Sequence, residues 1–317
     1  MAEITYSATA AEQLRDKVVV ITGGAQGIGA ATVTLLHALG AHVFFGDWDA
    51  RHGTQLEADL HSEKGKGIDS HGAGTAHFTQ VDVRNYQSQL ALFDAAHQKH
   101  GRVDVAISCA AVKEPSGWFE PESLDLATIR TEPVPITSAL DINLTSVVHF
   151  ARLALAYMKE TETTPPLSLG SAPSKSIVLV SSIAGITPAP GLFAYAAAKH
   201  GVVGLMRALA PWTPHQFAGL RVNAICPWAT ATQLLPGALR DRWTAEKMPL
   251  NTPADVARFI VQCAADGGIN GNAVFVSGGR GFDTEAGVER TQPLWMGEEN
   301  SEQFQKGQRI LGLGGDW

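Results

Sequence analysis

The stretch KVVVITGGAQGIG, residues 17–29, decides the fold. Its first half is an unbroken run of mostly β-branched apolar residues, which predicts a strand buried on both faces. Gly23, Gly27 and Gly29 follow, and residues 27–40 have the apolar spacing of a helix. A strand, a glycine-rich turn and a helix in this order predict a pyrophosphate-binding loop. Glycines allow the backbone to approach the phosphates closely, and the helix N-terminus attracts their negative charge.

The rest of the chain repeats this alternation of strand and helix. Apolar, β-branched runs predict seven strands, at 17–24, 41–47, 76–83, 103–111, 175–185, 220–228 and 272–279. Amphipathic stretches predict helices at 27–40, 88–101, 140–160, 194–210 and 253–266. This order favours an α/β fold, a doubly wound seven-stranded parallel sheet of the Rossmann type, formed as a single domain by residues 1–317.

Composition limits the classes of function. With 317 residues, of which 45% are hydrophobic and 17% charged, the chain can bury a large core. A net charge of −7 and a pI near 5.9 argue against a nucleic-acid partner, which needs a basic surface. No apolar run approaches the length of a membrane span, and the first residues lack the features of a signal peptide. We expect a cytoplasmic protein with no membrane partner, reduced cysteines and no metal site.

Asp47 ends the second predicted strand, roughly 20 residues past the glycine turn. A carboxylate here accepts hydrogen bonds from the adenosine ribose hydroxyls and repels the 2′-phosphate that distinguishes NADP from NAD. Gln26, inside the glycine turn, brings no positive charge to such a phosphate. The alternative is an ordinary glycine turn beside a surface aspartate. We expect NAD as the cofactor.

A second motif lies in AYAAAKHG, residues 194–201. Tyr195 and Lys199 are four residues apart, so a helix places them one above the other on the same face. The alanines between them favour helix and add almost no bulk. Taken alone, the pair is also consistent with an ordinary half-exposed helix face.

Together, the glycine turn and the Tyr195/Lys199 pair resemble the short-chain dehydrogenase/reductase family over about residues 16–279. The family pattern Thr-Gly-x-x-x-Gly-x-Gly is matched from Thr22 to Gly29. A serine about a dozen residues before the tyrosine is matched by Ser182 in VSSIAG, although the adjacent Ser181 is an alternative strand-end hydroxyl. An asparagine in the helix before the fifth strand is matched by Asn143, and Asp82 matches an acidic residue that contacts adenine.

The resemblance implies a catalytic set of Asn143, Ser182, Tyr195 and Lys199. Tyr195 is the expected acid/base of hydride transfer, since a free tyrosine has a pKa of about 10 and the ammonium of Lys199 is expected to lower it. Ser182 is expected to hold the substrate oxygen, and Lys199 the nicotinamide ribose. Asn143 is expected to fix a water that links Lys199 to solvent, or else to bridge neighbouring backbone.

The resemblance also implies a set of cofactor-binding residues along the carboxyl ends of the strands. These are Thr22, Gly23, Gln26, Gly27, Ile28, Gly29, Asp47, Asp82, Val83, Ala110, Ala111, Tyr195, Lys199, Pro227, Thr230 and Thr232. Two places depart from the family pattern. Residues 108–111 read SCAA where Asn-Asn-Ala-Gly is common, so Ala111 adds a methyl beside the adenosine ribose. Trp228 replaces the glycine after Pro227, so an indole either shapes the substrate pocket or crowds the cofactor.

By position, residues 227–250 correspond to the substrate loop of the family, and residues 280–317 form a C-terminal tail. The expected substrate side is apolar, at Trp228, Leu234, Leu235, Leu239, Trp243, Met248, Trp118, Phe119 and Phe193. This composition suits a bulky hydrophobic secondary alcohol or ketone. The CPWATAT run (226–232) and the end of the tail are similar to fungal members found in secondary-metabolite pathways. Family members commonly assemble, which implies a homodimer or homotetramer.

Two other functions remain open from the sequence. One is an NADPH-dependent ketoreductase, against which Asp47 and Gln26 count. The other is a cofactor-binding protein with little redox activity, which the SCAA segment and Trp228 favour and the complete catalytic set disfavours.

Overall fold

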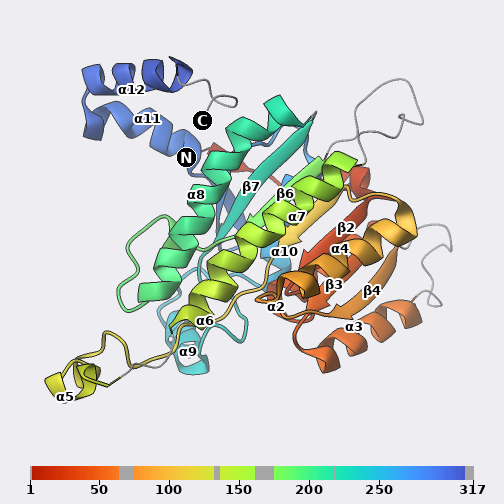
Figure 1. The fold of residues 1–317 in the computed structure, drawn as a ribbon, viewed down its shortest axis with the longest axis horizontal. Helices are drawn as coiled ribbons and strands as arrows, with labels where there is room; N and C mark the ends of the chain where they lie inside the picture. The colour runs from red at the N-terminus through yellow and green to blue at the C-terminus, as the bar shows by residue number, and fades with distance from the viewer. Residues whose placement is uncertain (1, 64–73, 132–135, 161–174, 218, 311–317) are drawn as a thin grey trace.

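A computed structural model of the chain describes residues 2–63, 74–131, 136–160, 175–217 and 219–310. Its centre is one nine-stranded sheet with the order β1-β9-β8-β7-β6-β5-β2-β3-β4 (Figure 1). Seven of these strands are parallel and correspond to the seven predicted ones: β2 (Val18–Thr22), β3 (His42–Asp47), β4 (Thr75–Gln80), β5 (Val105–Ser108), β6 (Lys175–Val180), β7 (Leu220–Pro227) and β8 (Ala273–Ser277). The doubly wound α/β prediction is therefore confirmed.

Two short strands that the sequence did not reveal extend the sheet beyond β8. The chain turns back after β8 into β9 (Arg280–Asp283), which pairs antiparallel with it, and β1 (Ala2–Ile4) pairs antiparallel with β9. Arg280 forms an ion pair with Glu3 across this outer pair, with a distance of 2.8 Å. The first described residues and the segment after β8 are thereby joined in one sheet.

Helices cover both faces of the sheet. One face carries α4 (Tyr86–His100), α7 (Ser146–Glu160) and α8 (Phe193–Gln216), whose apolar residues form one core cluster with the strands (Figure 1). The other face carries α1 (Ala8–Ala11), η1 (Glu12–Leu14), α2 (Gly27–Ala38), α3 (Ala50–Glu63) and α10 (Pro253–Ala265), around a second cluster. Both faces of the central parallel strands are thus buried, which explains their mostly apolar sequences, whereas the edge strand β4 is only partly buried.

Local sequence explains where several of these helices begin and end. Asn85 caps α4 by accepting hydrogen bonds from two backbone N–H groups, and Gly101 ends it with a φ of 69°. Thr252 and Asp255 form a reciprocal capping box at the start of α10, with Pro253 in its first turn. The caps at Asn85 and Thr252 fix where these helices begin and thus where the loops that leave the carboxyl edge of the sheet end.

The remaining segments lie at the periphery of the sheet. After β5 the chain leaves the core as an arm that contains η2 (Pro121–Ser123) and α5 (Leu126–Ile129), at the lower left of Figure 1. It returns through α6 (Thr137–Leu140) and the π-helical turn η3 (Asp141–Thr145). The other short elements are η5 (Ile183–Gly185), α9 (Gly237–Ala245), α11 (Glu285–Met296) and α12 (Glu298–Ile310).

One helical stretch, Thr137–Glu160, is long and apolar enough to cross a membrane by length and composition alone. Its buried residues, such as Phe150 and Met158, pack in the core cluster under α4 and α8. This is the position of a core helix in a globular domain.

Candidate active site

The glycine turn between β2 and α2 is closely packed against itself and against the neighbouring strand end. Gly23 has a φ of 70°, and a Cβ added there would lie 2.5 Å from the backbone nitrogen of Ala110. A Cβ on Gly29 would lie 1.8 Å from the carbonyl oxygen of Gly23. Any side chain at these positions would open the turn. The loop therefore has the tight backbone path that a pyrophosphate cradle requires, and it leads into the N-terminus of α2.

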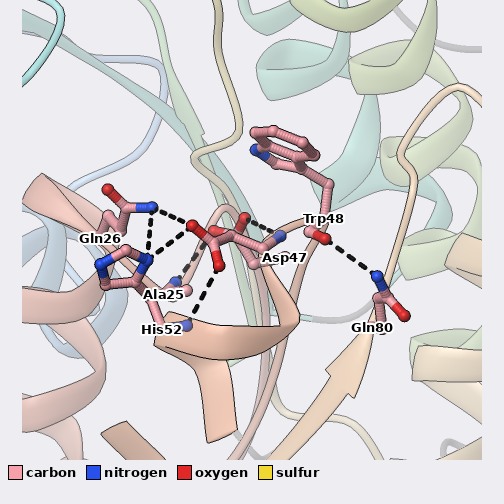
Figure 2. A network of polar contacts seen from close by, with 7 residues as sticks. Ala25, Gln26, Asp47, Trp48, His52 and Gln80 are labelled. Carbon is pink, nitrogen blue, oxygen red and sulfur yellow. Dashed lines mark hydrogen bonds and ion pairs between the residues drawn. The ribbon is translucent and has the colours of Figure 1, made fainter. Parts of the chain in front are cut away.

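Asp47 lies at the end of β3, where its carboxylate braces the glycine turn. Its Oδ2 accepts the N–H of Ala25 at 3.0 Å, and its Oδ1 accepts the N–H of Asp49 at 3.1 Å (Figure 2). A carboxylate has about four acceptor positions, so two backbone donors leave acceptor capacity for ribose hydroxyls. Asp47 is thus both a structural brace and an available acceptor at the cavity wall.

A second acid, which the sequence did not indicate, lies beside Asp47. Asp49 Oδ2 accepts the side-chain amide of Gln26 at 2.7 Å and contacts Nδ1 of His52 at 2.6 Å (Figure 2). Hydrogen bonds from the backbone and side chain of His52 lower the pKa of Asp49 below its usual value. The acidic rim of the cradle therefore consists of Asp47, which lines the cavity, and Asp49, which lies beside it outside the lining and orients Gln26.

Asp82 and Val83, which follow β4, line the same cavity as Asp47. Their contact with the cofactor stays a prediction. The carboxylate of Asp82 is held by the guanidinium of Arg84 at 2.6 Å, and this hydrogen bond lowers the pKa of Asp82. Trp48 also lines the cavity and is 75% exposed. Its indole points away from the polar network of Figure 2.

Tyr195 and Lys199 lie one turn apart in the first half of α8, and Ser182 follows β6 opposite them. The ammonium of Lys199 is 5.6 Å from the centre of the Tyr195 ring, and Tyr195 and Ser182 line the same cavity. Lys199 is 1% exposed, and its Nζ donates to the carbonyl of Val180 at 3.0 Å. Burial lowers the pKa of Lys199 to about 8. A buried amine held by a carbonyl oxygen is costly for stability, which makes it a marker of a functional site.

In the structure, the pKa of Tyr195 is set mainly by burial of its phenol. Burial raises the pKa of Tyr195 above its ordinary value, and its interaction with Ser182 only partly opposes this. The ammonium of Lys199 is directed to the carbonyl of Val180. The lowering of the Tyr195 pKa by Lys199 together with the nicotinamide ring stays a prediction.

The two neighbouring serines after β6 have different partners. The hydroxyl of Ser181 is buried and donates to the carbonyl of Lys199 at 2.8 Å, so it fixes α8 against the strand. The hydroxyl of Ser182 accepts the N–H of Ala184 at 3.2 Å and lies on the cavity wall beside Tyr195. Both serines line the cavity, and because the Ser181 hydroxyl is engaged with the carbonyl of Lys199, Ser182 is the better candidate to contact a bound molecule.

Asn143 is fully buried in the π-helical turn η3 that precedes α7. Its amide oxygen accepts the N–H of Val112 at 3.0 Å, and its amide nitrogen donates to the carbonyl of Val112 at 2.9 Å. The side chain thus joins η3 to the segment after β5. The role of Asn143 in holding a water stays a prediction. Single π turns are often found at functional sites.

The loop after β7 closes over the glycine turn. Thr232 packs against it, since its Cγ2 would lie 3.3 Å from a Cβ on Gly27. The hydroxyl of Thr230 donates to the carbonyl of Trp228 at 2.9 Å. Asn251, which the sequence did not single out, is fully buried and ties this loop to the end of β8 through Val276 and Gly279. The sequence could have indicated Asn251 only as a polar residue in the segment between the sixth and seventh predicted strands.

One cavity of about 1930 Å³ joins the glycine turn to the Tyr195 region, and Asn143, Asn251 and Asp49 lie outside its lining. The glycine turn, Asp47 and Asp82 lie along it, as do Ser182, Tyr195, Lys199 and the loop after β7. Ala111 and Trp228 line this space and leave it open. The volume is larger than the usual range of a small-molecule pocket, so the cavity has room for a dinucleotide and a second molecule.

The apolar wall of the cavity differs in part from the expected one. Trp228, Leu234, Leu235, Leu239 and Trp243 line it, whereas Trp118, Phe119, Phe193 and Met248 are not on its lining. Trp228 packs edge-on against Trp243, with ring centres 5.1 Å apart, and tilts against Phe275. Phe275 on β8 and Val288 on α11 complete the wall. The sequence did not place them there, because the reversal into β9 that brings α11 near the sheet was not foreseen.

The described residues contain no group of three or more histidine, cysteine or acidic side chains that could hold a metal ion. Within the same residues Cys109 is partly exposed, whereas Cys226 and Cys263 are buried. Burial raises the pKa of each thiol to about 12. Thiols with such pKa values are inert near neutral pH.

Residues 17–243 match the family model described as short chain dehydrogenase, and the chain belongs to this family. It is 34% identical over 275 residues to a short-chain dehydrogenase/reductase, ascJ, of Acremonium egyptiacum, covering 87% of this chain and 83% of the relative. It is 31% identical over 221 residues to 15-hydroxyprostaglandin dehydrogenase [NAD(+)] of Homo sapiens, covering 69% and 70% of the two chains. The crystal structure of levodione reductase superimposes with a TM-score of 0.66 at 25% identity, covering 84% of this chain and 98% of that one. The protein is therefore an oxidoreductase of the nicotinamide-dependent type that this family comprises.

Proposed function

We propose that the protein is an NAD-dependent oxidoreductase that interconverts a bulky hydrophobic secondary alcohol and its ketone. The observation that carries the proposal is the meeting of Tyr195, Ser182 and the buried Lys199 in the same cavity as a glycine turn too tight for any side chain. An open cavity past Ala111 and Trp228 counts against a binding protein without redox chemistry.

In the proposed reaction, the alcohol oxygen lies between Ser182 and Tyr195. Ser182 donates a hydrogen bond that orients this oxygen, and the Tyr195 oxygen takes the hydroxyl proton as the carbon loses its hydride. Bound NAD supplies the hydride acceptor and a positive nicotinamide ring. Since burial raises the pKa of Tyr195, the phenolate needs nearby positive charge, and Lys199 supplies it while it is protonated, below a pH of about 8. Ketone reduction reverses each step.

The acidic rim supports NAD rather than NADP. A 2′-phosphate on the adenosine ribose would approach the carboxylates of Asp47 and Asp49, which lie within two residues of each other. Gln26 adds no charge, and His52 is already paired with Asp49. The relative from Homo sapiens carries NAD(+) in its name, which agrees with this choice. The alternative of an NADPH-dependent ketoreductase has no comparable support among these residues.

The aromatic wall supports a bulky apolar substrate. Trp228, Trp243 and Phe275 form a continuous set of rings on the side of the cavity beyond Tyr195. Such a wall binds apolar surface, whereas Ser182 and Tyr195 recognise one oxygen. A homo-oligomeric state, a cytoplasmic location and a place in secondary metabolism remain predictions from the resemblance.

The function is tested with a panel of secondary alcohols of increasing apolar surface, namely cyclohexanol, α-tetralol and benzhydrol, each with NAD and with NADP. Formation of reduced nicotinamide is followed by absorbance. We expect turnover with NAD that rises with the size of the apolar group. Turnover with NADP only would contradict the choice of cofactor, and no turnover in either direction would contradict the proposed reaction.

A variant of the acidic rim tests the cofactor choice. Asp47→Ala would also free the N–H groups of Ala25 and Asp49, so we choose Asp47→Asn combined with Trp48→Arg. Removal of one charge and addition of a guanidinium is expected to shift the ratio of NADH to NADPH affinity about 100-fold toward NADPH. Titration with both cofactors measures the ratio. Trp48→Ala is the control, and an unchanged ratio in the double variant would mean that the rim does not contact the ribose.

A further inference from the structure

The first turn of α8, which carries Tyr195, is capped from a distant part of the chain. The residue before the helix, Leu192, has no side-chain acceptor for the free N–H groups of that turn. Glu114, from the segment after β5, takes this place. Its Oε1 accepts the N–H of Phe193 and its Oε2 accepts the N–H of Tyr195, each at 2.8 Å. Each carboxylate oxygen thus holds one donor of the turn.

Glu114 is itself held in place by the segment that leads to it. Two residues earlier, Val112 is bonded through both its N–H and its carbonyl to the buried amide of Asn143. Before that, Ala110 packs against Gly23 in the cofactor cradle. The six residues from Cys109 to Glu114 therefore run from the cofactor loop, past a fixed point on η3, to the start of the helix that carries Tyr195. All six line the cavity.

We propose that Glu114 is a positioning residue for the reaction, which acts by fixing the backbone of Tyr195 in the first turn of α8. This rests on the proposed role of Tyr195 as acid/base. The contact is made to the amide of Tyr195 itself, so the place of the Cα, and through it the place of the phenol beside Ser182, depends on Glu114.

A carboxylate suits this position for two physical reasons. Hydrogen bonds from N–H groups to an ionised oxygen are stronger than those between neutral groups, and a negative charge at a helix N-terminus is favoured by the helix dipole. Two equivalent oxygens also allow two donors to be satisfied at once. Glutamine has one acceptor oxygen, so Glu114→Gln keeps one of the two bonds, and alanine keeps neither.

The other catalytic side chain does not depend on this cap. One turn further along α8, the Lys199 ammonium is held by Val180 and the Lys199 carbonyl by Ser181, both on the sheet side of the helix. Loss of Glu114 should therefore disturb Tyr195 while Lys199 and the cofactor contacts remain. This predicts a loss in kcat without a matching loss in cofactor affinity, a pattern that general destabilisation does not produce.

The test compares Glu114→Ala and Glu114→Gln with wild type and with a matched control, Asp125→Ala. Asp125 also caps a helix N-terminus in the same arm, with Oδ1 accepting two backbone N–H groups, but its helix is α5. We measure kcat and KM with the best alcohol of the panel, NADH affinity, and amide hydrogen exchange along α8. A 1 Å misplacement of a reacting group can cost about 100-fold.

We expect Glu114→Ala to lower kcat about 10- to 100-fold, with NADH affinity within about 2-fold of wild type. The amides of Phe193 and Tyr195 should lose protection from exchange while that of Lys199 keeps it. Glu114→Gln should recover part of kcat, and Asp125→Ala should behave as wild type. Unchanged kcat in Glu114→Ala, unchanged exchange at Tyr195, or equal losses of kcat and NADH affinity would each overturn the proposal.

Tyr195→Phe, measured in the same series, separates the two levels of the argument. If Tyr195→Phe retains turnover, the proposed function fails, whatever Glu114 does. If Tyr195→Phe loses turnover but Glu114→Ala does not, only the positioning role fails. Should no alcohol be turned over, the exchange of the Tyr195 amide still decides whether Glu114 fixes that residue.

Discussion

Replacement of Tyr195 by phenylalanine is expected to lower kcat at least about 1000-fold, since a positioned general acid/base contributes roughly 100- to 10,000-fold to a rate. The change removes only the phenol oxygen. The ring stays in its place near Lys199, and the helix that holds both is unchanged. NADH affinity should therefore remain within about 2-fold of wild type, because the glycine turn and the acidic rim lie outside the altered group.

The measurement is kcat with the best secondary alcohol, with NADH affinity measured on the same preparation. Tyr157→Phe is the matched control. Its phenol, on α7, bonds Asp94 in the core, so its loss should affect stability by about 1 kcal/mol and leave kcat unchanged. Turnover of Tyr195→Phe near the wild-type rate would contradict the role of the phenol. Loss of turnover together with loss of NADH binding would mean that the substitution disturbed the fold.

The second large effect is expected for Gly29→Ala. The added methyl carbon would lie 1.8 Å from the carbonyl oxygen of Gly23, which is backbone and can move away only if the turn opens. Opening the turn displaces the N–H groups that face the pyrophosphate. We expect NADH affinity to fall at least about 100-fold, which corresponds to about 2.7 kcal/mol. Titration with NADH measures this loss.

Gly204→Ala is the control for this substitution. Gly204 also lies inside a helix, α8, but a Cβ there would have no heavy atom within 4 Å. The same change should therefore leave NADH affinity unaltered and stabilise the helix by about 1 kcal/mol. Equal NADH affinities for the two variants would show that the turn at Gly29 does not contact the cofactor.

Much of the fold was predictable from the sequence because its signals are local. Most of the parallel strands are buried on both faces, so they are largely apolar runs bounded by polar or glycine residues. The two antiparallel strands, β9 and β1, have only four and three residues and lie at the edge of the sheet. Strands of this length have no periodicity to read, and their pairing joins residues 2–4 to residues 281–283, which are far apart in sequence.

The residues of the candidate site also fall into those that the sequence predicts and those that it does not. Tyr195 and Lys199 share a helix face, and the glycine turn is contiguous, so spacing alone brings these residues together. Glu114 and Asn251 accept hydrogen bonds from backbone N–H groups that are distant in sequence, and Asp49 accepts one from the side chain of Gln26. The residues next to them in sequence do not reveal these partners. The pKa of Tyr195 depends on burial and on where the Lys199 ammonium points, and spacing in the sequence determines neither.

The central claim, that this cavity binds NAD for hydride transfer, is tested most directly by titrating the purified protein with NADH and, separately, with NADPH. The readout is energy transfer to the reduced nicotinamide from the seven tryptophans of the protein, of which Trp48, Trp228 and Trp243 line the cavity. The structure predicts NADH binding at least about 10-fold tighter than NADPH, a difference of about 1.4 kcal/mol that the carboxylates of Asp47 and Asp49 would impose. Tighter binding of NADPH would contradict the reading of the acidic rim, and binding of neither would contradict the claim itself.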